Sequence, residues 1–184
     1  MVGVRIRPSG LNMRRQHRSL DERLFVRFPA LYRSFAAFWS RLPTHSRLRR
    51  LILMRVVAQA TSAANRRDLD VLLTGFDPAL DFRMSGAAMF PPDLMGRHYG
   101  HAGYRELWRR MLEAFEDLTL ESEELIDLGD RLFSVTRMTG HGAGSGVPIN
   151  DRIFQVFTFH RGLVAKQEDY GERAEALEAA GLSE

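Results

Sequence analysis

Few side chains in this 184-residue chain have types and spacing that could support chemistry. Cysteine is absent, which excludes disulfides, thiolate metal ligands and cysteine nucleophiles. His98 and His101 have a spacing that could suggest metal binding. However, no acidic residue stands close by, and a loop-to-helix junction would hold the two rings apart, so we expect no metal site. The remaining candidates are Asp169, Arg137, and His98 with Tyr99.

The glycine-rich segment at residues 142–146 does not indicate phosphate binding. A phosphate-binding loop joins a strand to a helix and carries a lysine, and neither feature follows here. No apolar run reaches the length of a membrane span, and the N-terminus lacks the apolar stretch of a signal peptide. A cytoplasmic location is therefore expected.

Charge is unevenly distributed along the chain. Residues 1–67 hold 15 arginines against Asp21 and Glu22, a net charge of +13, and residues 68–184 hold 11 basic and 21 acidic residues, a net charge of −10. Such a basic arm could meet nucleic acid, an anionic membrane or the acidic half of its own chain. We expect this basic N-terminal region to contact the acidic half of its own chain. We expect no specific nucleic-acid partner, and the alternative is peripheral contact with a membrane.

Hydrophobic periodicity indicates the elements that must position these residues. Helical spacing is found at residues 20–42, 47–65, 69–76, 104–115 and 172–180. Strand-like alternation is found at residues 80–84, 119–128, 131–139, 149–160 and 163–170. This order predicts an α+β fold in which helices pack on one face of a curved antiparallel sheet of four to five strands.

The N-terminal extension, residues 1–45, is expected to lie outside the main domain at residues 46–184. Residues 1–19 are polar and arginine-rich, and we expect poor order there. Residues 20–45 carry too many large apolar groups to remain in water, among them Phe25, Tyr32 and Trp39, so we predict helices packed on the domain. An interfacial membrane helix is the alternative.

Several segments, in the right order, resemble the nuclear transport factor 2-like (NTF2-like) superfamily, which includes SnoaL-like polyketide cyclases and ketosteroid isomerases. They are NRRDLDVL at residues 65–72, FDPALDF at 76–82, YGHAGYREL at 99–107, RGLV at 161–164, EDY at 168–170, and the helix at 174–182. The resemblance implies a cone-shaped (cystatin-like) α+β barrel. Its sheet would wrap around a pocket for a small hydrophobic molecule and be closed by helices.

The same resemblance implies which side chains line that pocket. Alternation places Phe133, Val135 and Arg137 on one face of their strand, and it places Gln167 and Asp169 together on theirs. The predicted ligand-binding residues are Phe82, Met84, Trp108, Val135, Gln155, Phe157 and Gln167. The opposite faces, which include Leu132, Thr136, Met138, Val156, Thr158 and Tyr170, are too apolar for free solvent and predict a homodimer.

Each chemistry of the family requires particular residue types at particular positions. The positions of the ketosteroid isomerase base, tyrosine and second acid fall on Phe82, Ala60 and Gln155, so that chemistry is rejected. Epoxide-hydrolase-like members hold an arginine between two aspartates, and here Asp169 and Arg137 are present without the second acid. SnoaL-like cyclases use one pocket aspartate and no cofactor, a role that Asp169 could fill.

These comparisons predict a polar centre in which Asp169 and Arg137 face each other inside the pocket. A charge in an apolar cone is costly unless it is paired, and pairing would lower the pKa of Asp169 and suit a base or ligand anchor. His98 and Tyr99 at the pocket mouth would supply a proton. The functional hypothesis is a cofactor-independent cyclase, isomerase or hydrolase. The alternatives are a non-catalytic ligand-binding or dimerisation module, and a regulatory protein acting through its basic arm.

Overall fold

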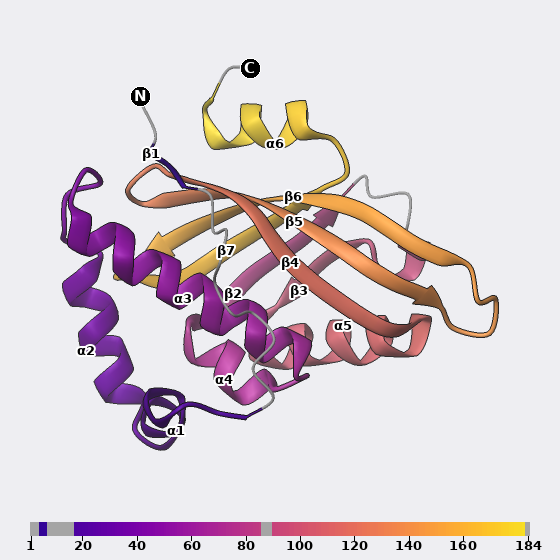
Figure 1. Cartoon of the computed structure of the whole chain (residues 1–184), viewed down its shortest axis with the longest axis horizontal. Helices are drawn as coiled ribbons and strands as arrows, with labels where there is room; N and C mark the ends of the chain where they lie inside the picture. The colour runs from indigo at the N-terminus through magenta and orange to yellow at the C-terminus, as the bar shows by residue number, and fades with distance from the viewer. Residues whose placement is uncertain (1–3, 7–16, 86–89, 183–184) are drawn as a thin grey trace.

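A computed structural model describes residues 4–6, 17–85 and 90–182, which form one curved sheet with helices on both faces (Figure 1). The helices are α1 (Leu20–Arg27), α2 (Pro29–Trp39), α3 (Arg47–Asn65), α4 (Leu69–Thr74), the 3₁₀ turn η1 (Pro92–Leu94), α5 (Gly100–Ala114) and α6 (Arg173–Ala180). The strands are β1 (Val4–Ile6), β2 (Phe76–Ser85), β3 (Gly96–Tyr99), β4 (Phe115–Asp127), β5 (Arg131–Gly142), β6 (Pro148–His160) and β7 (Leu163–Tyr170).

The described strands form a seven-stranded sheet in the order β1-β4-β5-β6-β7-β2-β3. Strands β4 to β7 are antiparallel neighbours, as predicted, whereas β2 pairs with β7 in parallel. The α+β fold class is confirmed, and the strand count exceeds the four to five expected. The two additional strands, β1 and β3, are too short to show a clear alternation in sequence.

Helices α3, α4 and α5 lie on the concave side of the sheet, and α6 lies on the other side (Figure 1). The concave core includes Leu72, Phe82, Leu107 and Met138. On the convex side, α6 packs Leu177 against the sheet. Both faces of the central strands are therefore covered by helices of the same chain.

Residues 20–45 form helices packed on the domain, which confirms that prediction. Helix α2 begins at Pro29, where the missing amide hydrogen costs no helical bond. Its buried face, with Tyr32 and Trp39, packs against Leu53 of α3 and Leu132 of β5. The expectation of poor order for residues 1–19 is wrong for the described strand β1, which pairs with β4, while residues 1–3 and 7–16 lie outside the described residues.

A buried arginine of α3 joins the end of this extension to the sheet. Ser46 caps α3 by accepting a hydrogen bond from the backbone amide of Arg49. The Arg49 guanidinium donates to both carboxylate oxygens of Asp127, at 2.7 and 2.9 Å, and both side chains are almost fully buried. It also donates to the backbone carbonyls of Ser40, Leu42 and Gly129. One side chain thus ties the end of α2 to the β4–β5 turn.

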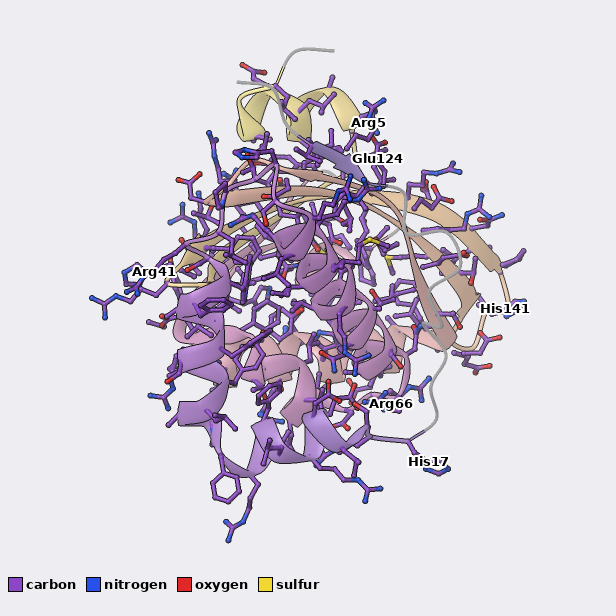
Figure 2. All side chains as sticks on the ribbon, turned by 60° about the vertical axis from the view of Figure 1, so that its left-hand side comes forward. Arg5, His17, Arg41, Arg66, Glu124 and His141 are labelled. Atoms are coloured by element: carbon purple, nitrogen blue, oxygen red, sulfur yellow. The ribbon has the colours of Figure 1, made fainter. Side chains whose placement is uncertain are left out.

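Other arginines near the N-terminus also meet acidic groups of the same chain. Arg5 on β1 pairs with Glu124 on β4 at 2.8 Å, and the two lie together beside the sheet in Figure 2. Arg18 pairs with Asp68 at the start of α4. These contacts agree with the expectation that the basic arm meets the acidic half of its own chain. No helix in the described part of the chain is long and apolar enough to cross a membrane.

Candidate functional site

The concave side of the sheet encloses a cavity of about 110 Å³, here called the Asp169 cavity. Apolar side chains from β2, α5, β5 and β6 form most of its wall, and Asp169 of β7 lies in the same wall. The lining includes Phe82, Met84, Phe90, Tyr104, Leu107, Trp108, Met111, Met138, Ile153, Phe157, Gln155 and Gln167. A mostly apolar wall with a few convergent polar groups is typical of a small-molecule site.

Asp169 is only 3% exposed and is held by two glutamine amides. The Gln167 amide donates to Asp169 Oδ1 at 2.9 Å, and the Gln155 amide donates to Oδ1 and Oδ2 at 3.0 and 3.1 Å. Thr136 in turn donates to Gln155 Oε1 at 2.8 Å, and Ser134 Oγ lies 3.5 Å from Thr136 Oγ1. The carboxyl group is therefore the end of a buried chain of neutral polar side chains.

The environment of Asp169 favours its protonated form. Burial away from water raises the pKa of Asp169 from 3.8 to about 7, although the hydrogen bonds from Gln167 and Gln155 act in the opposite direction. Neutral amides cannot offset the loss of hydration as a cation could. Burial also raises the pKa of the neighbouring Tyr104 hydroxyl, which therefore stays neutral. At neutral pH, Asp169 can both accept and donate a proton.

The predicted pairing of Asp169 with Arg137 is wrong. Arg137 lies on the opposite face of β5 and forms an ion pair with Glu123 of β4 at 2.9 Å, with about a third of its side chain exposed. The alternation along β5 was assigned correctly, but the inward set is the one that contains Ser134 and Thr136. The associated prediction that an ion pair would lower the pKa of Asp169 is therefore also wrong.

Val135 shares the convex face with Arg137 and packs in the cluster under α6, so its prediction as a ligand-binding residue is contradicted. Several residues of the apolar set that suggested a dimer are likewise buried within the monomer. Met138 lines the Asp169 cavity, and Leu132 belongs to the core with α2. The homodimer stays a prediction, but the apolar residues that are buried within the monomer no longer support it.

His98 and Tyr99 lie on β3, outside the described lining of the Asp169 cavity. His98 Nε2 is 3.2 Å from the Leu94 carbonyl oxygen, and its ring packs at 5.9 Å from the Phe82 ring. Tyr99 is 60% exposed. The His98 ring therefore packs against Phe82, a residue of the cavity wall. The structure brings neither His98 nor Tyr99 to Asp169. Among the described residues, no group of three or more histidine or acidic side chains could hold a metal ion.

The structure does bring the other predicted ligand-binding residues together. Phe82, Met84, Trp108, Phe157 and both glutamines line the Asp169 cavity. Ala60, at the position that corresponds to the isomerase tyrosine, lines it as well.

Sequence reasoning missed several residues of this cavity, and Met138 was assigned to the outer face together with Thr136. Thr136 was assigned to the outer face, although its strand neighbour Ser134 pairs directly with Gln155 in the sheet. Tyr104 was missed although it stands three and four residues before Leu107 and Trp108, on the same face of α5. Helical spacing alone could have identified Tyr104.

The chain thus combines a curved sheet over helices with a buried carboxyl group in the wall of an apolar cavity. The SnoaL-like domain model matches residues 57–167, and the chain belongs to this family. The matched segment contains every residue of the polar chain except Asp169, which lies two residues beyond it. No curated protein matches the chain.

Solved structures share the fold at low sequence identity. An NTF2-like protein of unknown function from Burkholderia pseudomallei is 23% identical, with a TM-score of 0.59 over 68% of this chain and 94% of that chain. TerC, co-crystallised with polyporic acid, is 20% identical, with a TM-score of 0.58 over 68% and 95%. A protein from a Jannaschia species, described as a SnoaL-like polyketide cyclase, is 17% identical, with a TM-score of 0.53 over 63% and 82%.

Proposed function

We propose that this SnoaL-like protein binds a small, largely hydrophobic molecule in the Asp169 cavity and transfers a proton within it, with Asp169 as the acid–base group. The observation that carries the proposal is a fully buried carboxyl with a pKa of about 7 that faces an apolar cavity. A general base or acid works best when its pKa lies near the working pH. The proposed reactions are cyclisation, isomerisation or hydrolysis without a cofactor.

The geometry suggests how the carboxyl would act. Oδ1 accepts two hydrogen bonds from the glutamines, and Oδ2 accepts one. Oδ2 has the larger free acceptor capacity, so it would take a proton from a carbon or oxygen next to a ligand carbonyl group and return it at another atom. Gln155 and Gln167 would orient the carboxyl throughout. Phe82 and Ala60 cannot exchange protons, so the arrangement differs from that of the ketosteroid isomerases.

The relatives support a ligand of this class. One structural neighbour is described as a polyketide cyclase, and TerC was crystallised with polyporic acid. The proposal for this chain rests on its own cavity, whose volume suits a single small ring.

Proton exchange into a small ketone tests the proposal without knowledge of the natural ligand. Cyclohexanone would be incubated with the protein in D₂O, and NMR would follow deuterium uptake next to the carbonyl. We expect deuterium uptake to be faster with the wild type than in buffer alone. The rate of uptake should rise with pH through an apparent pKa near 7, as the base form of Asp169 appears. Asp169→Asn should reduce uptake to the buffer rate, while the exposed control Asp130→Asn should not change it.

Equal exchange by the wild type and Asp169→Asn would refute acid–base catalysis on this probe. If a ligand binds, the binding requires Asp169, and no exchange occurs, the alternative of a non-catalytic binding module is favoured instead. A homodimer and a cytoplasmic location remain part of the proposal.

A further inference from the structure

A second cavity lies beside the Asp169 cavity, between the N-terminal extension and the sheet. It has a volume of about 140 Å³ and is here called the extension cavity. Phe25 of α1 and Tyr32 of α2 contribute to its wall, and Leu53 and Val57 of α3 line it as well. An apolar cavity of about 150 Å³ is large enough for benzene, so this space matches one aromatic ring. Its described lining does not include Asp169, so the proposed proton transfer does not account for it.

Two residues that line this cavity each carry a buried polar atom that has no hydrogen-bond partner among the described residues. Glu22 of α1 is 3% exposed, and its Oε2 accepts hydrogen bonds from the Ser19 amide at 2.7 Å and from Arg66 at 3.1 Å. Its other oxygen, Oε1, has no partner in the described part of the chain, and neither does Ser122 Oγ of β4. A buried acceptor without a donor is costly, and a ligand hydroxyl could remove that cost.

The charge balance indicates which kind of donor fits. The Glu22 carboxylate already forms an ion pair with Arg66, so a second cation is not needed for neutrality. A negatively charged group would be repelled by the carboxylate and would have no donor at Oε1. A neutral hydroxyl on an aromatic ring satisfies Oε1 and buries its ring against Phe25 and Val57.

The two cavities share part of their walls. Ala60, Phe76, Thr136, Gln155 and Phe157 line both of them. Gln155 also binds Asp169, so its side chain stands between the two spaces. An elongated molecule that begins at Asp169 could therefore place its far end in the extension cavity.

We propose that the extension cavity is a second subsite, which binds the phenol-type ring at the far end of an elongated ligand through a hydrogen bond to Glu22. The inference rests on the proposed function only for the position of the near end of that ligand. The N-terminal extension would then take part in substrate selection. Glu22 and Phe25 precede the segment that matches the family model, so this specificity would be a property of this chain's extension.

The test uses the full chain and three small fluorinated probes: 4-fluorophenol, fluorobenzene and 4-fluorobenzoate, with affinities measured by ¹⁹F NMR titration. We expect 4-fluorophenol to bind about tenfold more tightly than fluorobenzene, and 4-fluorobenzoate not to bind. Glu22→Gln should remove the preference for phenol and leave fluorobenzene binding unchanged. Glu113→Gln is the matched control, because Glu113 is an exposed glutamate that also pairs with an arginine.

Two further variants keep the inference falsifiable if Glu22→Gln fails to fold. Val57→Phe should fill the extension cavity and remove the tighter binding of 4-fluorophenol, whereas Ser122→Ala removes the other unpartnered oxygen and should leave fluorobenzene binding intact. Asp169→Asn should leave phenol binding unchanged. Equal affinity for phenol and fluorobenzene, or a preference for phenol that survives Val57→Phe, would overturn the inference. Loss of phenol binding in Asp169→Asn would place the ring in the Asp169 cavity, which overturns the second subsite but not the proposed function.

Discussion

Replacing Arg49 with methionine should destabilise the protein strongly. The guanidinium has five N–H donors, and the structure gives it five hydrogen bonds: two to Asp127 and one each to the carbonyls of Ser40, Leu42 and Gly129. Methionine keeps much of the packing volume, but among the described residues it leaves the buried Asp127 carboxylate with a single donor, the Gly129 amide. Breaking a buried ion pair in this way costs about 3–5 kcal/mol.

Chemical denaturation followed by circular dichroism measures this loss in the free energy of unfolding. For a chain of this size each kcal/mol corresponds to about 2–4 °C, so the melting temperature should fall by roughly 6–20 °C. Arg152→Met is the matched control, because Arg152 pairs with Glu123 at the surface, where such pairs contribute about 0–1 kcal/mol. The double variant Arg49→Met/Asp127→Leu should lose less than the sum of the two single variants. A loss below about 1 kcal/mol in Arg49→Met would refute the anchoring role of the pair.

Three other outcomes are expected. Because the folded pKa of Asp169 is raised to about 7 from 3.8, the folded state binds more protons between these values, and stability should fall as pH rises through that window. Asp169→Asn lacks this dependence, so the melting temperature of the variant should rise relative to that of the wild type between pH 4 and 8. Parallel curves of melting temperature against pH would contradict the raised pKa. Gly162→Ala should cost at least about 1–3 kcal/mol by thermal melting, because Gly162 has φ +79° and an added Cβ would overlap the Ala36 carbonyl oxygen. Gly144→Ala, with φ +75° but open space, is its control and should cost less. Light scattering should give the mass of two chains at micromolar concentration, and the mass of one chain would end the homodimer prediction.

The sequence allowed the elements and their order to be predicted because their periodicity is strong. Strands β5, β6 and β7 begin and end within three residues of the expected positions. The helices of the extension could be predicted because Leu31, Phe35, Phe38 and Leu42 recur at helical spacing. The buried face of α2 is the adjacent one with Tyr32 and Trp39, whereas Leu31 and Phe38 are exposed.

The orientation of β5 could not be predicted, for a physical reason. Alternation identifies a strand face by contrasting an apolar side with a polar one. On β5 that contrast is absent, because α6 covers Phe133 and Val135 while the cavity side carries Ser134 and Thr136. The more apolar face was therefore assigned to the interior. On β7 the face was assigned correctly, and both Gln167 and Asp169 point inward.

The ends of the sheet have a consequence for how copies of this chain behave when crowded. An exposed strand edge offers unpaired amides and carbonyls to any second strand, which makes it a starting point for aggregation. Among the described residues, β1 pairs with β4 at residues 125–127, and the Asn65 side chain bonds the backbone of Leu120. Elsewhere that edge carries exposed Glu116, Asp117 and Glu121. Two such edges brought together would oppose carboxylates of the same sign. High salt or low pH, which weakens that repulsion, should therefore be the condition under which this protein begins to form fibrils.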